Sequence, residues 1–283
     1  MRKQTKRNLK TAAVAGLAGL FAGYETSPTT TEYYLHQHLG HNTYSIDNRS
    51  VKFASWLAFR ITGLSPTPWA VKHRLHHSPF DSQEPNPRVK AMVTAVCTVL
   101  TNRAEAEGAI ANPDILRHIT FEGDVADPLI DTTGENPSLK FQNKLDEWLS
   151  RRPVLDRALP VATIAVLSAV GTMGLKRPLS ESITGSVALV AGFAAATYLP
   201  GLVAAYPERK DGYTAPTEAG SNLHVGYQRV FGNYALHASH HEAPHLSELP
   251  DATPDNRDLR TSQFLAARGW GHGHDGQPAT TNL

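Results

Sequence analysis

The chain has 283 residues, of which 41% are hydrophobic and 19% are charged, a composition that excludes a mostly disordered protein and allows one large domain. Its 27 basic and 26 acidic residues nearly cancel, so the net charge of +1 gives no reason to expect a nucleic-acid partner. The single cysteine, Cys97, excludes an internal disulfide framework, a four-cysteine zinc site and an iron–sulfur cluster held by this chain alone.

The N-terminus combines a basic start with an apolar run. Residues 1–10 contain five Lys or Arg, and residues 11–24 read TAAVAGLAGLFAGY. This segment could be a signal peptide, a short membrane helix or an amphipathic anchor. A full span would place the basic start outside the cell, against the positive-inside tendency. We therefore expect residues 12–24 to form a short apolar helix that lies in the membrane interface or re-enters.

Nine of the 14 histidines are grouped along the chain. His36 and His41, in HQHLGH, are five residues apart, which on a regular α-helix separates them by about 140°, so they would reach different metals or bracket a helix end. The motif HxxHH occurs twice, and its spacing places three imidazoles on one helical face. Its two copies are His73, His76 and His77, and His237, His240 and His241. His224 stands alone between them.

Three further stretches lie between the first two histidine groups and residue 152. The apolar stretches 53–64 and 91–100 are too short to cross a bilayer, so we expect them at the membrane interface or in the core. Residues 140–152, KFQNKLDEWLSRR, predict an amphipathic helix, either on the membrane surface or simply solvated. Its apolar side would carry Phe141, Leu145, Trp148 and Leu149.

Two uncharged runs, Leu159 to Leu175 and Ser182 to Tyr206, are separated by KRPLSE and predict a membrane hairpin, with a buried hairpin of a soluble protein as the alternative. Five basic residues flank the pair and two lie in the connection, so the flanks and all histidine groups are expected on the cytoplasmic side. From Ser247 onward Pro, Asp, Thr and Gly are frequent. We therefore predict one domain over 1–246 and a flexible tail over 247–283.

Grouped histidines at helical spacing favour a metal site, because burying several imidazolium ions is costly whereas neutral imidazole binds iron, copper or zinc. A structural zinc site needs four ligands, so eight or nine histidines fit two metals and a dinuclear redox centre better. HEAPH, residues 241–245, formally matches the zinc-protease motif HExxH, but Pro244 would break the helix that this motif requires. A carboxylate di-iron site would need paired ExxH motifs, and Glu242 to His245 is a single instance.

These motifs, in this order and with an apolar hairpin between the second and third, resemble the membrane fatty acid desaturase and hydroxylase superfamily, in particular its stearoyl-CoA desaturase branch. HQHLGH resembles the first histidine box, HxxxxH. WAVKHRLHH is similar to the WARDHRxHH of the second box. HASHHEAP resembles the third box with its HHxxP, and SNLHVGYQR, which contains His224, looks like the isolated ligand that relatives carry in NSxAHxxGYR.

The resemblance implies an all-α fold in which membrane helices are capped by a cytosolic helical domain, with two iron ions held between the nine histidines. It implies an oxidoreductase that uses O₂ to introduce a double bond into an acyl chain, carried by CoA or by another lipid. The electrons would come from a separate carrier of the ferredoxin or cytochrome b5 type, since no such segment is visible in this chain. No catalytic residue beyond the metal ligands is implied. Trp69, beside the second box, would line the substrate path or serve packing.

The chain departs from the family pattern at several positions. The asparagine that holds a metal-bound water in relatives is Gly220 here, so Asn222 or Asn233 would have to substitute. The contacts to the acyl carrier are also expected to differ, because the Arg-Asp pair before the second box is Val71-Lys72 and the downstream Asp-Pro is approximated by Glu84-Pro85. Two other functions stay open: a lipid hydroxylase or oxygenase built on the same site, and a non-catalytic membrane protein that binds metal.

Overall fold

The computed structural model describes residues 2–77, 102–119, 128–132, 134, 137–211, 225–243 and 245–274. For some residues inside helices, His76 and His241 among them, the description covers the backbone alone. Cys97, the apolar stretch 91–100, Glu84-Pro85, Gly220, Asn222 and His224 lie outside the described residues.

The described part of the chain is mostly helical, as predicted. The α-helices are α1 (Arg2–Ser27), α2 (Arg49–Thr62), α3 (Pro66–His76), α5 (Arg103–Ile110), α6 (Pro113–Ile119), α7 (Lys144–Ser150), α8 (Pro153–Ala169), α9 (Leu179–Asp211), α10 (Gln228–Phe231), α11 (His237–Glu242) and α12 (Arg257–Ala267). Two π-helices, η1 (Pro28–His41) and η2 (Val170–Gly174), and two 3₁₀-helices, η3 (Val225–Tyr227) and η4 (Gly232–Leu236), complete the helical elements.

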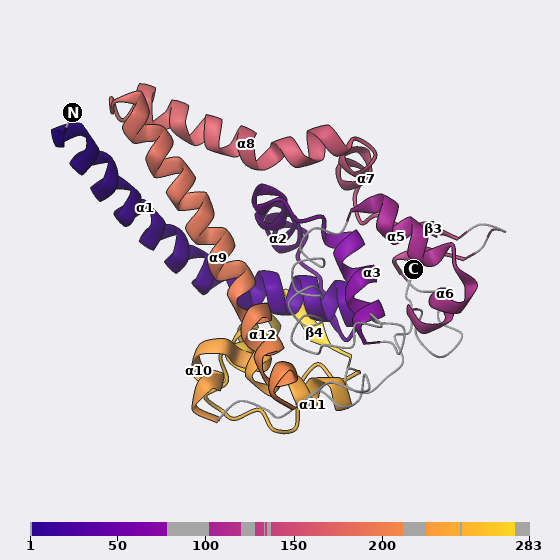
Figure 1. Ribbon diagram of the computed structural model, residues 1–283. Coiled ribbons are helices and arrows are strands. Elements are labelled where there is room, and N and C mark those ends of the chain that lie inside the picture. The colour runs from indigo at the N-terminus through magenta and orange to yellow at the C-terminus, as the bar shows by residue number, and fades with distance from the viewer. Residues whose placement is uncertain are drawn as a thin grey trace.

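Two small antiparallel sheets accompany the helices. β1 (Tyr44–Ile46) pairs with β4 (Gly271–Gly273), and β2 (Ile130–Asp131) pairs with β3 (Ser138–Leu139). Figure 1 shows an arm made of α1, α8 and α9 that projects from a body containing η1, α2, α3 and the C-terminal elements. The end of the arm farthest from the body, where α1 begins and α8 joins α9, is called the tip below.

Two helices are long and apolar enough to cross a membrane, Pro153–Gly174 and Leu179–Tyr198, by length and composition alone. Within their most apolar windows 11% and 28% of the residues are buried, so most of their side chains are at least partly exposed in the described structure. The two helices meet at the tip and diverge towards the body (Figure 1). The two predicted apolar helices are therefore present, and exposed apolar side chains are unfavourable for helices that face water.

α1 is one continuous helix that runs beside α9, with both helices directed from the tip towards the body (Figure 1). Their backbones touch at glycines: a Cβ on Gly23 would lie 2.6 Å from the Phe193 carbonyl oxygen, and one on Gly19 would meet the Leu189 carbonyl even more closely. Small residues permit this approach between helices. Residues 12–24 lie within this continuous helix, which does not turn back, and their position relative to a membrane stays a prediction.

Replacing Gly19 by Ala should therefore destabilise the protein by about 1–3 kcal/mol, since the added methyl group has no room against the α9 backbone. The measurement is thermal unfolding of the detergent-purified chain. Gly108→Ala is the matched control, because a Cβ at Gly108 meets nothing within 4 Å. Equal unfolding temperatures for the two variants would contradict the close packing of α1 on α9.

The parallel arrangement also changes the charge count used to assign the cytoplasmic side. It brings the five basic residues of the N-terminus to the tip, beside Lys176 and Arg177, which makes seven there against the five that flank the hairpin at the body end. The positive-inside tendency therefore no longer favours the body end.

A buried ion network joins α2 to the start of α8. Arg60, which is 2% exposed, donates to the carboxylates of Asp146 and Asp156, and the Trp56 indole N–H donates to Asp146 at 2.8 Å. The amphipathic helix predicted over 140–152 is the shorter α7, and its apolar residues differ in burial. Leu149 is buried, whereas Leu145 and Trp148 are 47% and 45% exposed.

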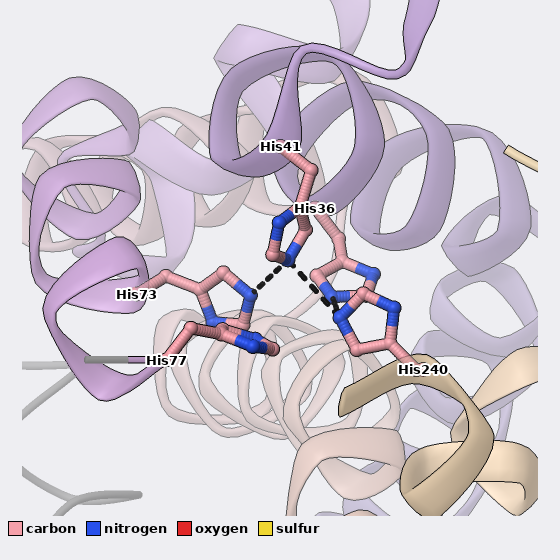
Figure 2. A group of neighbouring side chains, drawn as sticks. All are labelled: His36, His41, His73, His77 and His240. Atoms are coloured by element: carbon pink, nitrogen blue, oxygen red, sulfur yellow. Dashed lines mark hydrogen bonds between the residues drawn. The ribbon is translucent and has the colours of Figure 1, made fainter. Parts of the chain in front are cut away.

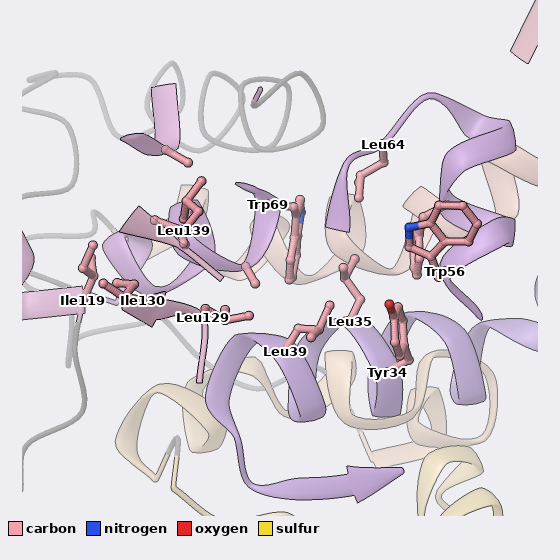
Figure 3. Close-up of a cluster of buried hydrophobic side chains, with 14 of the residues drawn as sticks. Tyr34, Leu35, Leu39, Trp56, Leu64, Trp69, Ile119, Leu129, Ile130 and Leu139 are labelled. Atoms are coloured by element: carbon pink, nitrogen blue, oxygen red, sulfur yellow. The ribbon is translucent and has the colours of Figure 1, made fainter. Parts of the chain in front are cut away.

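The apolar core lies between η1, α2, α3 and the β2–β3 pair (Figure 3). Leu35 and Leu39 bury one face of η1 against it, and Trp69 contributes from α3. Because η1 is fixed on this side by its leucines, the side chains on its other faces keep defined positions.

The predicted flexible tail is wrong for residues 247–274. Asn256 caps α12 by accepting from the backbone N–H groups of Asp258 and Leu259, and Leu265 of α12 is 1% exposed in the core. β4 then pairs with β1, with Ser45 opposite His272. The composition of this segment suggested a flexible tail, but turn residues such as Asn and Asp also cap helices. The folded domain extends to His274, and residues 275–283 lie outside the description.

Candidate metal centre

Five histidines from three distant parts of the chain converge at one point. Each offers a ring nitrogen, and these nitrogens all lie within 4.8 Å of one another (Figure 2). η1 supplies two of the side chains, α3 and the residue that ends it supply two, and α11 supplies one; they are His36, His41, His73, His77 and His240. Four are buried and His77 is partly buried.

The first motif reaches this point because η1 is a π-helix. In a π-helix the hydrogen bonds run from residue i to i+5, so residues five apart lie on successive turns of the same face. The N–H of Asn42 accordingly donates to the carbonyl of Gln37, and Asn42 ends the helix in the left-handed region with φ of 54°. The rings of His36 and His41 lie 4.9 Å apart. The predicted divergence of about 140° is wrong, because it assumed a regular α-helix.

α3 presents His73 and His77 from one face, as the HxxHH spacing predicts. It can approach η1 closely because residue 40 is glycine: a Cβ there would lie 3.1 Å from the His73 ring. Trp69 stacks on His73 with ring centroids 4.7 Å apart and planes at 6°. Trp69 therefore orients His73 by packing, and its contact with a substrate stays a prediction.

Arg74, inside the second motif, ties α3 to the end of η1. It donates from Nε to the Gly40 carbonyl at 2.6 Å and from Nη2 to the Leu39 carbonyl at 2.9 Å. Burial lowers the pKa of Arg74 to about 9, so the guanidinium stays charged at neutral pH. A cation at the carbonyl end of a helix is favourable, and this one fixes the backbone immediately before His41.

The distances between the ring nitrogens fit a cation at the centre. His41 Nε2 lies 2.9 Å from His73 Nε2 and 3.0 Å from His240 Nε2. His240 Nε2 in turn lies 3.0 Å from His36 Nε2. Each Nε2 carries either one proton or one lone pair in the ring plane. Two donors would therefore have to alternate with two acceptors along the series of four nitrogens.

Two protons cannot make three linear hydrogen bonds, whereas a metal ion accepts lone pairs from all four nitrogens together. Nitrogen ligands about 2.1 Å from a metal and at right angles to each other lie about 3.0 Å apart, which agrees with these separations. The five residues are therefore compatible with a metal site.

Glu32 orients His36 from behind. Its Oε2 accepts from His36 Nδ1 at 3.0 Å, and its Oε1 accepts from Gln37 Nε2 and from Asn233 Nδ2, each at 2.9 Å. Burial raises the pKa of Glu32, but the neighbouring His36 and these hydrogen bonds outweigh it and lower the pKa. With its proton held on Nδ1, His36 presents an Nε2 lone pair to the cluster, the usual arrangement around metal-bound histidine.

Sequence reasoning missed Glu32, although its position four residues before His36 could have indicated it. The sequence offers Asn233 as one of two substitutes for the asparagine that holds a metal-bound water in the family. Its Nδ2 donates to Glu32, and its Oδ1 accepts from Asn256 Nδ2 at 3.1 Å. Its observed role is therefore to hold Glu32. Behind this network, burial and the nearby Glu32 raise the pKa of Asp258 to about 8, while the backbone N–H of Asn233 lowers it.

Of the four other predicted ligands, His237 alone has a described side chain, and it lies apart from this group. His237 is buried in α11, with its ring 6.2 Å from that of His240, and does not belong to the five. His76 and His241 lie in α3 and α11 by their backbone, but their side chains lie outside the description, as does the whole of His224. In the described ranges one metal-ligating group is found, so a second metal stays a prediction.

The zinc-protease alternative is contradicted by the end of α11. The helix stops at Glu242, and His245 follows it in a turn as an exposed residue. HExxH requires both histidines on one helix.

Comparison with known proteins gives no assignment, since no family model, no curated protein and no solved structure matches this chain.

Proposed function

We propose that the protein is a membrane-associated fatty acyl desaturase that holds two iron ions between its histidine motifs. The observation that carries the proposal is the convergence of two, two and one histidines from the first, second and third boxes onto a single buried point. Chance does not account for three sequence motifs of this spacing and order meeting in space. We therefore infer that their imidazoles share a task.

The residues that would hold the first iron are among the five clustered histidines. The second iron would be held by the remaining histidines of the nine together with some of these five. An iron pair bound there would supply the O₂ chemistry by which relatives of the superfamily remove hydrogen from an acyl chain. The chain's own contribution is a shell of neutral imidazoles with Glu32 and Trp69 fixing two of them, which leaves the metal charge largely uncompensated and favours a strongly oxidising centre.

The exposed apolar helices α8 and α9 support insertion into a bilayer, which would bring a lipid-like acyl chain to the body. The acyl group would be carried by CoA or by another lipid, and a ferredoxin or cytochrome b5 type protein would deliver electrons. We assign the histidine-bearing body to the cytoplasmic side because such carriers are found there. The basic residues do not support this assignment, since seven lie at the tip and five at the body end.

Expression of the full chain in cells fed with acyl chains of several lengths tests this proposal. Lipid profiling by mass spectrometry should reveal a product two mass units lighter than the substrate in wild type, and iron analysis should give about two irons per chain. His240→Gln should abolish the product and lower the iron content. The matched control is His245→Gln, which changes an exposed histidine five residues away.

Each alternative has its own outcome. A product heavier by sixteen mass units would identify a hydroxylase or other oxygenase. One redox-silent metal per chain, with no product and with metal content unchanged in His240→Gln, would contradict the enzyme proposal and leave a non-catalytic metal-binding membrane protein.

A further inference from the structure

Two basic segments that are far apart in the sequence meet at the tip of the arm. Because α1 runs parallel to α9, its first turns lie beside the connection between η2 and α9 (Figure 1). Three contacts fix this arrangement: Gln4 Nε2 donates to Ser180 Oγ at 3.5 Å, Thr11 Oγ1 donates to Glu181 Oε1 at 3.0 Å, and Arg7 Nη2 pairs with Glu181 Oε2 at 3.2 Å.

The tip carries a large excess of positive charge. Its exposed cations are Lys3, Lys6, Arg7, Lys10, Lys176 and Arg177, which we call the basic tip. Glu181 is the single acidic residue in 1–24 and 159–206, and it is shared by Arg7 and by Arg177, whose Nη1 lies 3.3 Å from Glu181 Oε1. One carboxylate against six cations leaves the lysines uncompensated by acids of the tip.

Exposed apolar side chains begin directly next to these cations. They are Leu9, Val14, Leu17, Phe21, Met173 and Leu175, each at least 62% exposed. Long basic side chains above an apolar surface match the boundary between lipid headgroups and acyl chains, where the stems stay in apolar surroundings and the charges reach the headgroups. Nucleic acid offers phosphate charge but no apolar phase to cover the leucines and Phe21, so a lipid is the better match.

We propose that the basic tip binds the headgroups of anionic phospholipids and anchors the end of the arm in an anionic leaflet. This inference rests on the membrane insertion in the proposed function and is independent of the metal and of the reaction. Each basic residue near an anionic bilayer surface strengthens binding roughly fivefold. The attraction decreases at high ionic strength because salt screens exposed charges.

The test uses the full-length protein in neutral detergent micelles containing either dioleoylphosphatidylglycerol or dioleoylphosphatidylcholine. Native mass spectrometry counts the lipids retained by each chain. Wild type should retain the anionic lipid at least tenfold better than the zwitterionic lipid at low salt, and this preference should shrink at high salt. The tip variant Lys3→Gln, Lys6→Gln, Lys10→Gln, Lys176→Asn should lose the preference.

The substitutions keep Arg7 and Arg177, and with them the ion pairs of Glu181. Asn is chosen at residue 176 because Lys176 has φ of 53°, a left-handed conformation that Asn tolerates. The matched control removes four exposed cations from the body, Arg49→Gln, Lys140→Gln, Lys144→Gln and Arg260→Gln, and should keep the preference.

Equal retention of both lipids by wild type, or an equal loss of preference in the body variant, would overturn the inference. So would co-purified nucleic acid that the tip variant releases while lipid retention stays unchanged. Failure of the membrane proposal is distinguishable, because the wild-type chain would then leave cell membranes on alkaline washing without detergent. Failure of the enzyme proposal is read from iron content and products, which the tip variant should leave unchanged.

Discussion

Removal of residues 247–283 should abolish the metal centre, although none of these residues is a proposed ligand. The deleted segment supports both histidine-bearing ends of the site. Asp251 accepts from Ser239 Oγ at 2.6 Å, between His237 and His240, and Asn256 donates to Asn233, the residue that holds Glu32. The backbone N–H of Asn233 also donates to Asp258 at 2.7 Å and would lose its partner inside the protein.

The same segment fixes the entry to η1. Arg257 donates to Ser27 Oγ at 3.1 Å and its guanidinium lies 3.7 Å from the Tyr24 ring centre. β4 adds its pairing with β1, three residues beyond His41. Loss of these contacts should allow η1 and α11 to move apart, so that their imidazoles no longer meet.

The measurement is metal content per chain after affinity purification, together with the thermal unfolding temperature. We expect the 1–246 chain to retain less than a tenth of the wild-type metal and to unfold at a markedly lower temperature. A chain ending at His274 is the matched control and should behave as wild type. Normal metal content in the 1–246 chain would mean that the C-terminal segment is dispensable for the site.

Replacement of Glu32 should weaken metal binding by about 10- to 100-fold, the usual effect of losing a carboxylate that orients a ligating histidine. Glu32→Gln is informative because the side-chain size is kept. If the oxygen of the new Gln side chain accepts from His36 Nδ1, the amide N–H groups of that Gln must face two donors, Gln37 Nε2 and Asn233 Nδ2. If the Gln oxygen instead accepts from those two donors, the amide group of the Gln faces His36 Nδ1 as a second donor, and His36 loses its fixed orientation.

Metal retention against a chelator, measured beside the unfolding temperature of the metal-free protein, separates orientation from general stability. An orienting role predicts a large loss of metal retention with a smaller change in the metal-free unfolding temperature. Glu25→Gln, an exposed glutamate of α1 seven residues earlier, is the matched control. If Glu32→Gln retains metal as well as Glu25→Gln does, Glu32 does not orient a ligand.

The spacing of the histidines carried most of the information about the site that the sequence contained. HxxHH correctly placed His73 and His77 on one side of α3, because a regular helix needs only local hydrogen bonds to set that geometry. The same reasoning failed for His36 and His41. Their segment is a π-helix, and nothing in a count of residues distinguishes five residues of π-helix from five of α-helix. Leu35 and Leu39 pack this helix into the core, and Arg74 donates to the carbonyl groups at its end.

Local pattern thus determined the helical class, the two long apolar helices and the set of nine histidines from which the clustered five come. Tertiary structure alone decided that α1 lies along α9, that Glu32 stands behind His36, and that residues 247–274 belong to the fold. Each of these depends on contacts between segments far apart in the chain: glycines against a distant backbone, a carboxylate bonded to Asn233 about two hundred residues later, and β4 paired with β1. Such contacts are specified by packing in three dimensions, which periodicity and composition along one segment do not encode.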